Sequence, residues 1–226
     1  MRKITLTLLA LTLVAAPSLR AQPLPPAIQN GVLTFLGDQS SNGTIGGAQV
    51  GPYAASLSGF QAPLNSANAT IWCVDWDHFA PPVGSPDSYA ASRIFGTGID
   101  LSATRKNDLA IYEQAAWLIE QFGTASVYTA GNIQGSLWQL FSPGTATSVA
   151  VAGDSYTQQL FTPGSFSLTR DWYVLSDCAG GTGCVSNQEF MTGTPRSTVP
   201  EPGTYALMAA GLAAVGVIRR RRKTNA

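Results

Sequence analysis

The amino-acid sequence predicts an α+β fold, an antiparallel β-sandwich or barrel that carries a helical insertion. Short runs rich in Val, Ile, Tyr, Phe and Trp, separated by Gly, Asn, Ser and Pro, occupy the first part of the chain and return after residue 170. Between them lies a stretch without Gly or Pro, residues 102–122, whose apolar positions recur at helical spacing. With 226 residues, 45% of them hydrophobic, the chain has material for one ordinary domain.

Each predicted strand is a short β-type run bounded by turn residues. Because such residues interrupt every run, we expect antiparallel strands joined by short connections. The six runs are Val32–Leu36, Tyr53–Phe60, Thr70–Trp76 and Tyr89–Phe95 before the insertion, and Asp171–Ser176 and Asn187–Met191 after it.

The first predicted helix lies near residues 103–122. Two apolar rows, one through Tyr112 and one through Leu118, indicate a helix that is buried on most of its circumference. Ser102 or Asn107 is the expected N-cap, since both residue types accept hydrogen bonds from free backbone N–H groups.

A second predicted helix lies near residues 132–142. Asn132 is its expected N-cap, and the Pro143-Gly144 pair is expected to end it. A similar Pro-Gly pair twenty residues later suggests a further short helix around residues 155–160.

The start of the sequence has the three parts of a secretory signal peptide. Two basic residues are followed by an apolar run, and then by small residues and prolines. We expect a signal peptide of residues 1–21, cleaved after Ala21 in preference to Ala16. A proline-rich linker, residues 22–27, would then lead to the exported domain, residues 28–191.

The end of the sequence predicts a polar spacer, residues 192–199, and then a single transmembrane helix, residues 204–218. This uncharged stretch spans about 22 Å as a helix against a hydrocarbon core of about 30 Å, so it is a short span. The positive-inside rule places the basic residues that follow it in the cytoplasm and the domain on the outer side of the membrane. Those residues are Arg219, Arg220, Arg221, Arg222 and Lys223. A permanent tail anchor is the simplest interpretation.

Residues 200–223 also resemble a sorting signal, that of the PEP-CTERM proteins. The motif Pro200-Glu201-Pro202, an apolar helix rich in small residues and an arginine cluster follow one another in the order of that family. There an integral-membrane exosortase reads the tail and cuts near the Pro-Glu-Pro motif. The resemblance implies exosortase as a partner, an inner-membrane stage with the domain outside, and a final place at the cell surface or in the extracellular matrix. It implies nothing about the activity of the domain.

The exported part is mildly acidic. Between Gln22 and Pro200 there are five basic and twelve acidic residues, a net charge of about −7. The formal charge of zero for the whole chain is therefore a product of its two ends. Because the domain lacks a basic stripe, no nucleic-acid partner is expected.

The chain has three cysteines, an odd number for an exported protein. Cys178 and Cys184 enclose the short loop AGGTG and are the natural disulfide pair, a bridge that should stabilise the fold by about 2 kcal/mol. Cys73 is left over, and its simplest role is that of a buried thiol on a central strand.

The segment TIWCVDWDHF, residues 70–79, contains Cys73 and the only histidine, His78. Alternation along a strand places Cys73 on one face and Trp76 and His78 on the other, which disfavours a cysteine–histidine dyad. With one histidine and no Cys-x-x-Cys or EF-hand-like spacing, neither a metal site nor a cofactor is expected. No Gly-x-Ser-x-Gly motif is present, and no catalytic residue is predicted.

The sequence WCVD, which contains Cys73, and the sequence IQGSLW, which contains Gln134, resemble the cysteine and glutamine segments of surface thioester domains. In those domains, best known from Gram-positive adhesins, the cysteine sulfur attacks the glutamine carbonyl and ammonia leaves. The resulting thioester can acylate an amine on a host or matrix partner. The resemblance implies such a bond between Cys73 and Gln134. The reaction needs a dry apolar pocket, which Trp72, Trp76 and Trp138 are expected to wall.

Three functions therefore remain open. The first is a non-enzymatic surface or adhesive protein, sorted by exosortase, that binds extracellular polysaccharide or attaches to an amine-bearing partner through Cys73 and Gln134. The second is a structural or carbohydrate-binding β-module, suggested by five tryptophans in a chain with 12% charged residues. The third is a hydrolase that uses His78 with an aspartate.

Overall fold

The computed structural model describes residues 24–39, 42–45, 47–124, 127–143, 167–177 and 187–196, together with Met208, Gly211 and Leu212. Residues 24–196 belong to one compact unit, and the two ends of the chain belong to another. The predicted signal peptide, the helix around residues 155–160 and the Cys178–Cys184 pair lie outside the described residues. So does most of the predicted span 204–218, and among the described residues no helix is long and apolar enough to cross a membrane.

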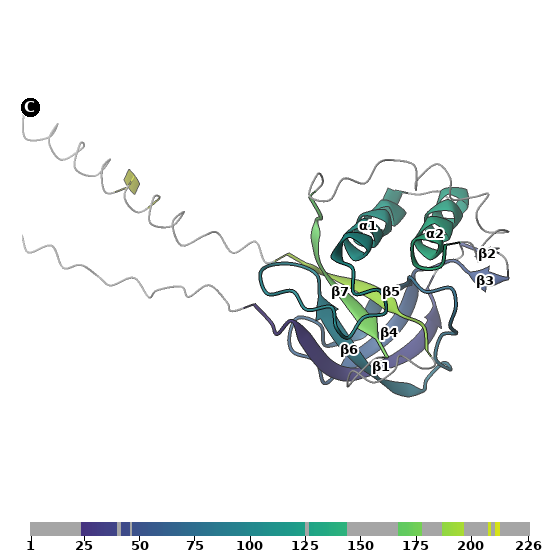
Figure 1. Ribbon diagram of the computed structural model, residues 1–226, viewed down its shortest axis with the longest axis horizontal. Coiled ribbons are helices and arrows are strands. Elements are labelled where there is room, and N and C mark those ends of the chain that lie inside the picture. Colours follow the sequence, from purple (N-terminus) through teal and green to yellow (C-terminus); the bar gives the residue numbers. More distant parts are fainter. Residues whose placement is uncertain are drawn as a thin grey trace, which may run out of the picture. The chain divides into compact units, whose positions relative to one another are not determined.

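Six antiparallel strands close into a barrel, so the fold is a barrel and not a sandwich (Figure 1). Around the barrel the strands are β1 (Ile28–Asp38), β4 (Tyr53–Ser58), β5 (Ser66–Cys73), β8 (Phe190–Pro195), β7 (Arg170–Ser176) and β6 (Pro86–Arg93). A separate two-stranded sheet consists of β2 (Thr44–Ile45) and β3 (Ala48–Gln49).

Strand β1 closes the barrel because it pairs with β4 along one edge and with β6 along the other. Its register with β4 shifts between Phe35 and Gly37, a bulge that bends the strand. Gly37 has a φ of 103°, a conformation that a residue with a Cβ atom rarely adopts. The glycine therefore allows the bend that curves β1.

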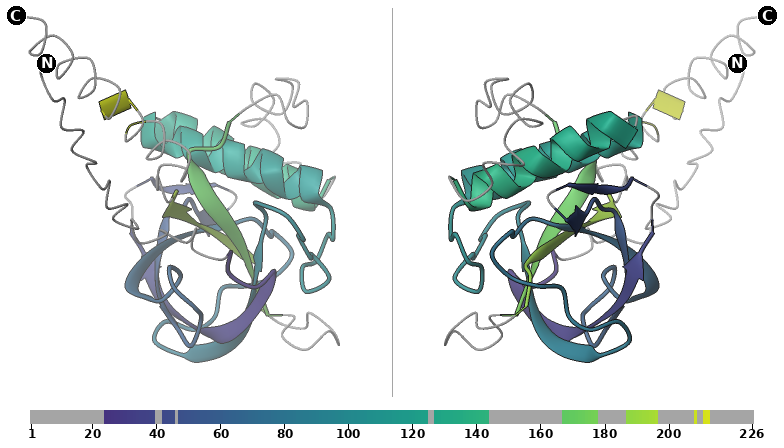
Figure 2. Two further views of the ribbon diagram at one scale, coloured as in Figure 1. Left: turned by 90° about the vertical axis from the view of Figure 1, so that its left-hand side faces the viewer. Right: turned by 90° about the vertical axis from the view of Figure 1, so that its right-hand side faces the viewer.

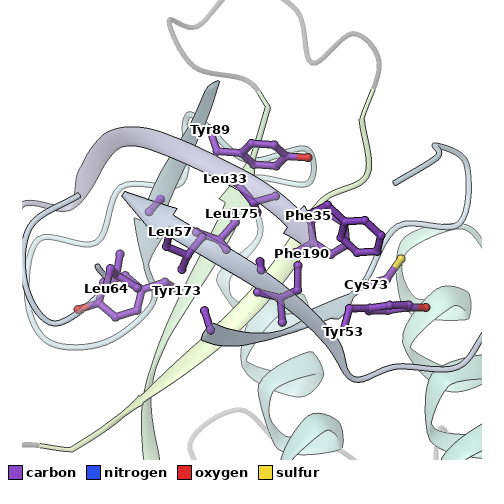
Figure 3. Close-up of a cluster of buried hydrophobic side chains, with 14 of the residues drawn as sticks. Leu33, Phe35, Tyr53, Leu57, Leu64, Cys73, Tyr89, Tyr173, Leu175 and Phe190 are labelled. Carbon is purple, nitrogen blue, oxygen red and sulfur yellow. The ribbon is translucent and has the colours of Figure 1, made fainter. Parts of the chain in front are cut away.

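The barrel interior is filled by the inward-facing side chains of alternate strand positions (Figure 3). In β5, Ile71 and Cys73 point into this cluster, whereas Trp72 and Val74, the residue directly after the strand, point outward. The alternation predicted for residues 71–74 is therefore confirmed. Other members of the interior cluster are Leu33, Phe35, Tyr53, Ala55, Leu57, Tyr89, Tyr173, Leu175 and Phe190.

The insertion between β6 and β7 contains α1 (Leu109–Glu120), a 3₁₀ turn (Gln121–Thr124) and α2 (Val127–Phe141). The two helices lie side by side (Figure 1), and both lie over one side of the barrel (Figure 2). Tyr112 and Leu118 of α1 are both fully buried, as its two apolar rows predicted. A second hydrophobic cluster joins the helices to the outer faces of β5, β7 and β8 through Trp72, Val74, Trp172, Val174 and Met191.

The predicted starts of both helices were wrong. α1 begins at Leu109, and its N-cap is Asp108, whose side chain accepts a hydrogen bond from Ala110 N (2.9 Å). The preceding residues form turns, and Asn107 has a φ of 46°, so the helix cannot start earlier. α2 begins at Val127, which places Asn132 inside the helix and not at its cap.

Every predicted strand has at least one boundary that differs from the prediction, and two of these differences bear on the site and the spacer. β5 ends at Cys73, three residues before the predicted end at Trp76, because the chain turns there into a polar cluster described below. β8 spans Phe190–Pro195, so it starts later than predicted and takes up the first residues of the expected spacer 192–199.

Candidate functional site

Cys73 is the last residue of β5, and its side chain lies inside one end of the barrel. It is fully buried, and its sulfur lies beside the rings of Phe35 and Tyr53 (Figure 3). The chain beyond it is fixed because Val74 N donates a hydrogen bond to Glu189 O (3.1 Å). Cys73 is thus a rigidly placed thiol in apolar surroundings.

Gln134 approaches Cys73 from α2, which lies 61 residues further along the chain. Its Nε2 donates a hydrogen bond of 2.8 Å to the main-chain oxygen of Cys73, and its Oε1 accepts one of 3.3 Å from Gly51 N. The side chain is fully buried. The structure therefore brings together the two residues that the sequence resemblance pairs.

Two further hydrogen bonds orient the sulfur of Cys73. Trp138 Nε1 donates to Sγ over 3.4 Å, and the thiol donates to the main-chain oxygen of Asp75 over 3.0 Å. Burial raises the pKa of the Cys73 thiol to about 12, an effect that the hydrogen bond from Trp138 opposes. The sulfur is accordingly a neutral thiol at physiological pH.

Gly51 is a part of this site that the sequence analysis missed. Its backbone N–H points at Gln134 Oε1, the oxygen that would become negative if a nucleophile attacked the side-chain carbonyl carbon. A backbone donor leaves no mark in a sequence, and Gly51 lies 83 residues from Gln134. Only the fold brings the two groups together.

The tryptophans around the sulfur differ from the expectation at one position. Trp138 is buried, and its ring centroid lies 4.5 Å from that of the half-buried Trp76, so this pair forms one wall of the site. Trp72 does not contribute, because it lies on the outer face of β5 against Trp172 (5.6 Å between centroids). None of the five tryptophans is exposed: Trp76 and Trp117 are half-buried, and the other three are buried.

A polar cluster follows directly after β5, where the strand prediction failed. Asp75 Oδ2 lies 2.7 Å from His78 Nδ1 and 3.2 Å from Arg105 Nη1. Arg105 Nη2 also lies 2.9 Å from Asp177 Oδ1, so one guanidinium joins two buried carboxylates. Trp76 consequently turns toward the interior cluster, away from the face it would take on a regular strand.

His78 lies between Asp75 and Arg105. Its Nδ1 lies 2.7 Å from Asp75 Oδ2, and Arg105 Nη1 lies 2.7 Å from Nδ1 and 2.8 Å from Nε2. His78 is therefore held by the ion-pair cluster, and within the described part of the chain no hydrogen bond joins it to Cys73.

A pocket of about 380 Å³ lies beside this cluster, lined by Asp75, Asp77, His78, Arg105, Phe141 and Ser142. Lys106 also lines it. Ser142 Oγ donates to Asp77 Oδ2 (2.6 Å), which directs its hydroxyl proton toward that carboxylate. In the described ranges no three His, Cys, Asp or Glu side chains are grouped so that they could hold a metal ion.

The remaining predicted site residues belong to parts of the chain that the structure does not describe. These are Cys178 and Cys184, the motif residues Pro200, Glu201 and Pro202, and the basic residues Arg219, Arg220, Arg221 and Arg222.

Comparison with known families bears on the C-terminal end. The family model of the PEP-CTERM protein-sorting motif matches residues 198–223, which confirms the resemblance seen in the sequence. The motif implies an exported protein that is anchored in the membrane before it is sorted to the cell surface. The particular signal is the one that exosortase processes, and exosortase is therefore the processing partner. No curated protein and no solved structure matches the chain.

Proposed function

We propose that this exosortase-sorted surface protein carries an internal thioester between Cys73 Sγ and Gln134 Cδ, and that the bond lets it attach covalently to an amine-bearing partner at the cell surface. The observation that carries the proposal is the buried contact between Gln134 and Cys73, which come from two elements far apart in the chain.

The position of the amide favours the bond-forming step. The 2.8 Å hydrogen bond from Gln134 Nε2 to Cys73 O fixes the amide against the residue whose sulfur would attack it. Gly51 N, 3.3 Å from Oε1, is placed to stabilise the negative charge that develops on that oxygen. The attack on the Gln134 carbonyl carbon would therefore use the Cys73 sulfur, and the stabilisation of the charge on Oε1 would use a different group, the N–H of Gly51.

The step is balanced without a cofactor. Cys73 Sγ bonds to Gln134 Cδ, the Cδ–Nε2 bond breaks, and the thiol proton leaves with the nitrogen as ammonia. Both starting groups and both products are neutral overall, which suits a site where burial raises the pKa of Cys73 to about 12. Exclusion of water from fully buried groups would also protect the thioester from hydrolysis.

The attachment step follows from the same bond. An amine nitrogen attacks Gln134 Cδ, the Cδ–Sγ bond breaks, and one amine proton ends on the Cys73 sulfur. The products are an amide to the partner and a free thiol. No second enzyme or energy source is required, because the thioester is already the activated acyl group.

Intact-mass spectrometry of the purified protein tests the proposal. The wild-type protein should be lighter than its sequence by one ammonia, and treatment with methylamine should raise the mass by one methylamine and release one thiol. Cys73→Ala and Gln134→Ala should each abolish the loss of ammonia. Gln139→Ala, at a half-buried position of the same helix, is the matched control and should retain it. A wild-type protein of full mass whose Cys73 reacts with thiol reagents in the folded state would contradict the proposal.

A further inference from the structure

Helix α2 runs alongside the segment that follows β5. Gln134, Trp138 and Ser142 share one face at intervals of four residues. The residues to which they bond follow the same order along the chain: Gln134 and Trp138 bond to Cys73, and Ser142 bonds to Asp77. The end of α2 near Ser142 therefore lies beside residues 73–77, which connect Asp77 to the residue that carries the sulfur.

The pocket described above lies on this path. Asp77 and Lys106 are exposed and form its rim, whereas Asp75 is 4% exposed and forms its floor. The main-chain oxygen of Asp75 accepts the hydrogen bond of the Cys73 thiol, so the floor adjoins the sulfur. Trp138, whose Nε1 bonds to the same sulfur, is in ring contact with Trp76 at 4.5 Å between centroids.

The charges of the pocket are not all compensated. Asp75 on the floor is paired with His78 and Arg105. Asp77 on the rim accepts a hydrogen bond from Ser142, but among the described residues no cation forms an ion pair with it. Lys106 likewise has no ion-pair partner within the described part of the chain. The rim thus presents one carboxylate able to receive a cation, and one ammonium group that would repel it.

We propose that this pocket is the docking site of the amine-bearing partner, a protonated primary amine such as a lysine side chain, with Asp77 as the carboxylate that receives the ammonium group. The inference rests on the proposed thioester, for which the pocket supplies the entrance. Asp77 is a specificity-determining residue and forms no covalent bond. As the ammonium group leaves Asp77 it gives its extra proton to water, and the neutral amine then attacks Gln134 Cδ. The half-buried Trp76 follows Asp75 in the chain and packs against Trp138, so it is the side chain we expect to move when the amine enters.

The two opposite charges on the rim allow a test with two substitutions, one at each charge. Asp77→Asn removes the attracting charge while the amide oxygen can still accept the hydrogen bond from Ser142. Lys106→Gln removes the repelling charge at an exposed position. If an ammonium group docks at the rim, the two substitutions must change its reaction in opposite directions.

The experiment measures the rate at which the thioester of the full-length protein is opened, followed by intact mass, in the wild type and both variants. Cadaverine, a cationic primary amine, is the probe, and hydroxylamine, which is uncharged at neutral pH, is the control nucleophile. With cadaverine we expect the rate to fall about fivefold in Asp77→Asn and to rise by a similar factor in Lys106→Gln, as for one partly solvated charge pair. With hydroxylamine both rates should equal that of the wild type.

The outcomes separate this inference from the proposed function. A wild-type protein without the loss of ammonia overturns both. A thioester that forms but opens with cadaverine at equal rates in the three proteins overturns the docking site alone, as does an equal change with both nucleophiles. Equal rates in the three proteins would be expected if the amine entered from the side of Gly51, because neither substituted residue lies there. If Asp77→Asn does not form the thioester, the rate at which cadaverine opens the thioester of Lys106→Gln is the test. A rate above that of the wild type supports the docking site, and an equal rate overturns it.

Discussion

Glu189 gives the most quantitative prediction about the stability of this fold. Its side chain is fully buried between β8, α1 and the turn before α1, where Oε1 accepts a hydrogen bond from Tyr112 Oη (2.6 Å) and Oε2 accepts one from Arg105 N (3.0 Å). Burial raises the pKa of Glu189 from 4.5 to about 7, and its hydrogen bonds only partly oppose this shift. The folded protein therefore binds this proton more tightly than the unfolded chain.

The sign and size of the effect follow from that difference. Stability that depends on the neutral form is fully present below pH 4.5 and is lost as the pH rises through about 7. At about 1.4 kcal/mol per pKa unit, the free energy of unfolding should fall by about 3 kcal/mol between these limits because of this residue. Glu189→Gln removes the titration while its amide oxygen keeps one of the two hydrogen bonds.

Urea unfolding of the purified protein at pH 5 and pH 8 measures the effect. The free energy of unfolding should decrease from pH 5 to pH 8 by about 3 kcal/mol more in the wild type than in Glu189→Gln. Glu113→Gln is the matched control, since this α1 carboxyl also has a raised pKa through burial but is far less enclosed, and it should leave most of the difference intact. Equal pH dependence in the wild type and Glu189→Gln would refute the reasoning.

Two further predictions concern the ion pairs and the sorting signal. Arg105→Ala leaves the carboxylates of Asp75 and Asp177 buried without their cation and should lower the free energy of unfolding by about 3–5 kcal/mol. Arg196→Ala breaks the ion pair with Asp171, whose arginine is 45% exposed, and should lower the free energy of unfolding by less than about 1 kcal/mol in the same urea experiment. Equal losses in the two variants would contradict the conclusion that the Arg105 pairs contribute more because they are buried. Alanine at Pro200, Glu201 and Pro202 should leave the protein at its unprocessed mass in the membrane fraction of cells that contain exosortase, and a shortened product would show that another segment is recognised.

Much of the fold could be predicted because local rules determine it. Period-two alternation assigned Ile71 and Cys73 to one face of β5 and Trp72 to the other, as the barrel requires. The two apolar rows of α1 likewise indicated burial on two sides. Closure of the sheet could not be predicted, because it depends on the pairing of β1 with both β4 and β6, which are distant in sequence.

The errors arose where distant residues override local preference. Asp75 and Trp76 were expected to continue a strand, but Asp75 instead pairs with Arg105, which lies 30 residues further along the chain, and the strand ends at Cys73. Asn132 is a good cap residue by type, yet it lies inside α2 because the burial of Ile133 and Gln134 outweighs its weak helix propensity.

In the candidate site, too, the residues in local sequence motifs could be predicted and those brought together by the fold could not. Cys73 and Gln134 could be identified because each belongs to a short segment that resembles a known one. Gly51 could not, because its contribution is a backbone N–H that the fold brings to Gln134. The pocket at Asp77 and Lys106 is also a product of the tertiary structure, since it combines residues from three separate segments.

The most direct test of the thioester is to identify the bond itself. The native protein would be digested under acidic conditions, where amines are protonated and cannot open a thioester, and the peptides analysed by tandem mass spectrometry. We predict a linked pair in which the peptide containing Cys73 is joined to the peptide containing Gln134, lighter by one ammonia than the sum of the two. Recovery of both peptides only as separate species, with an intact Cys73 thiol and an intact Gln134 amide, would contradict the account.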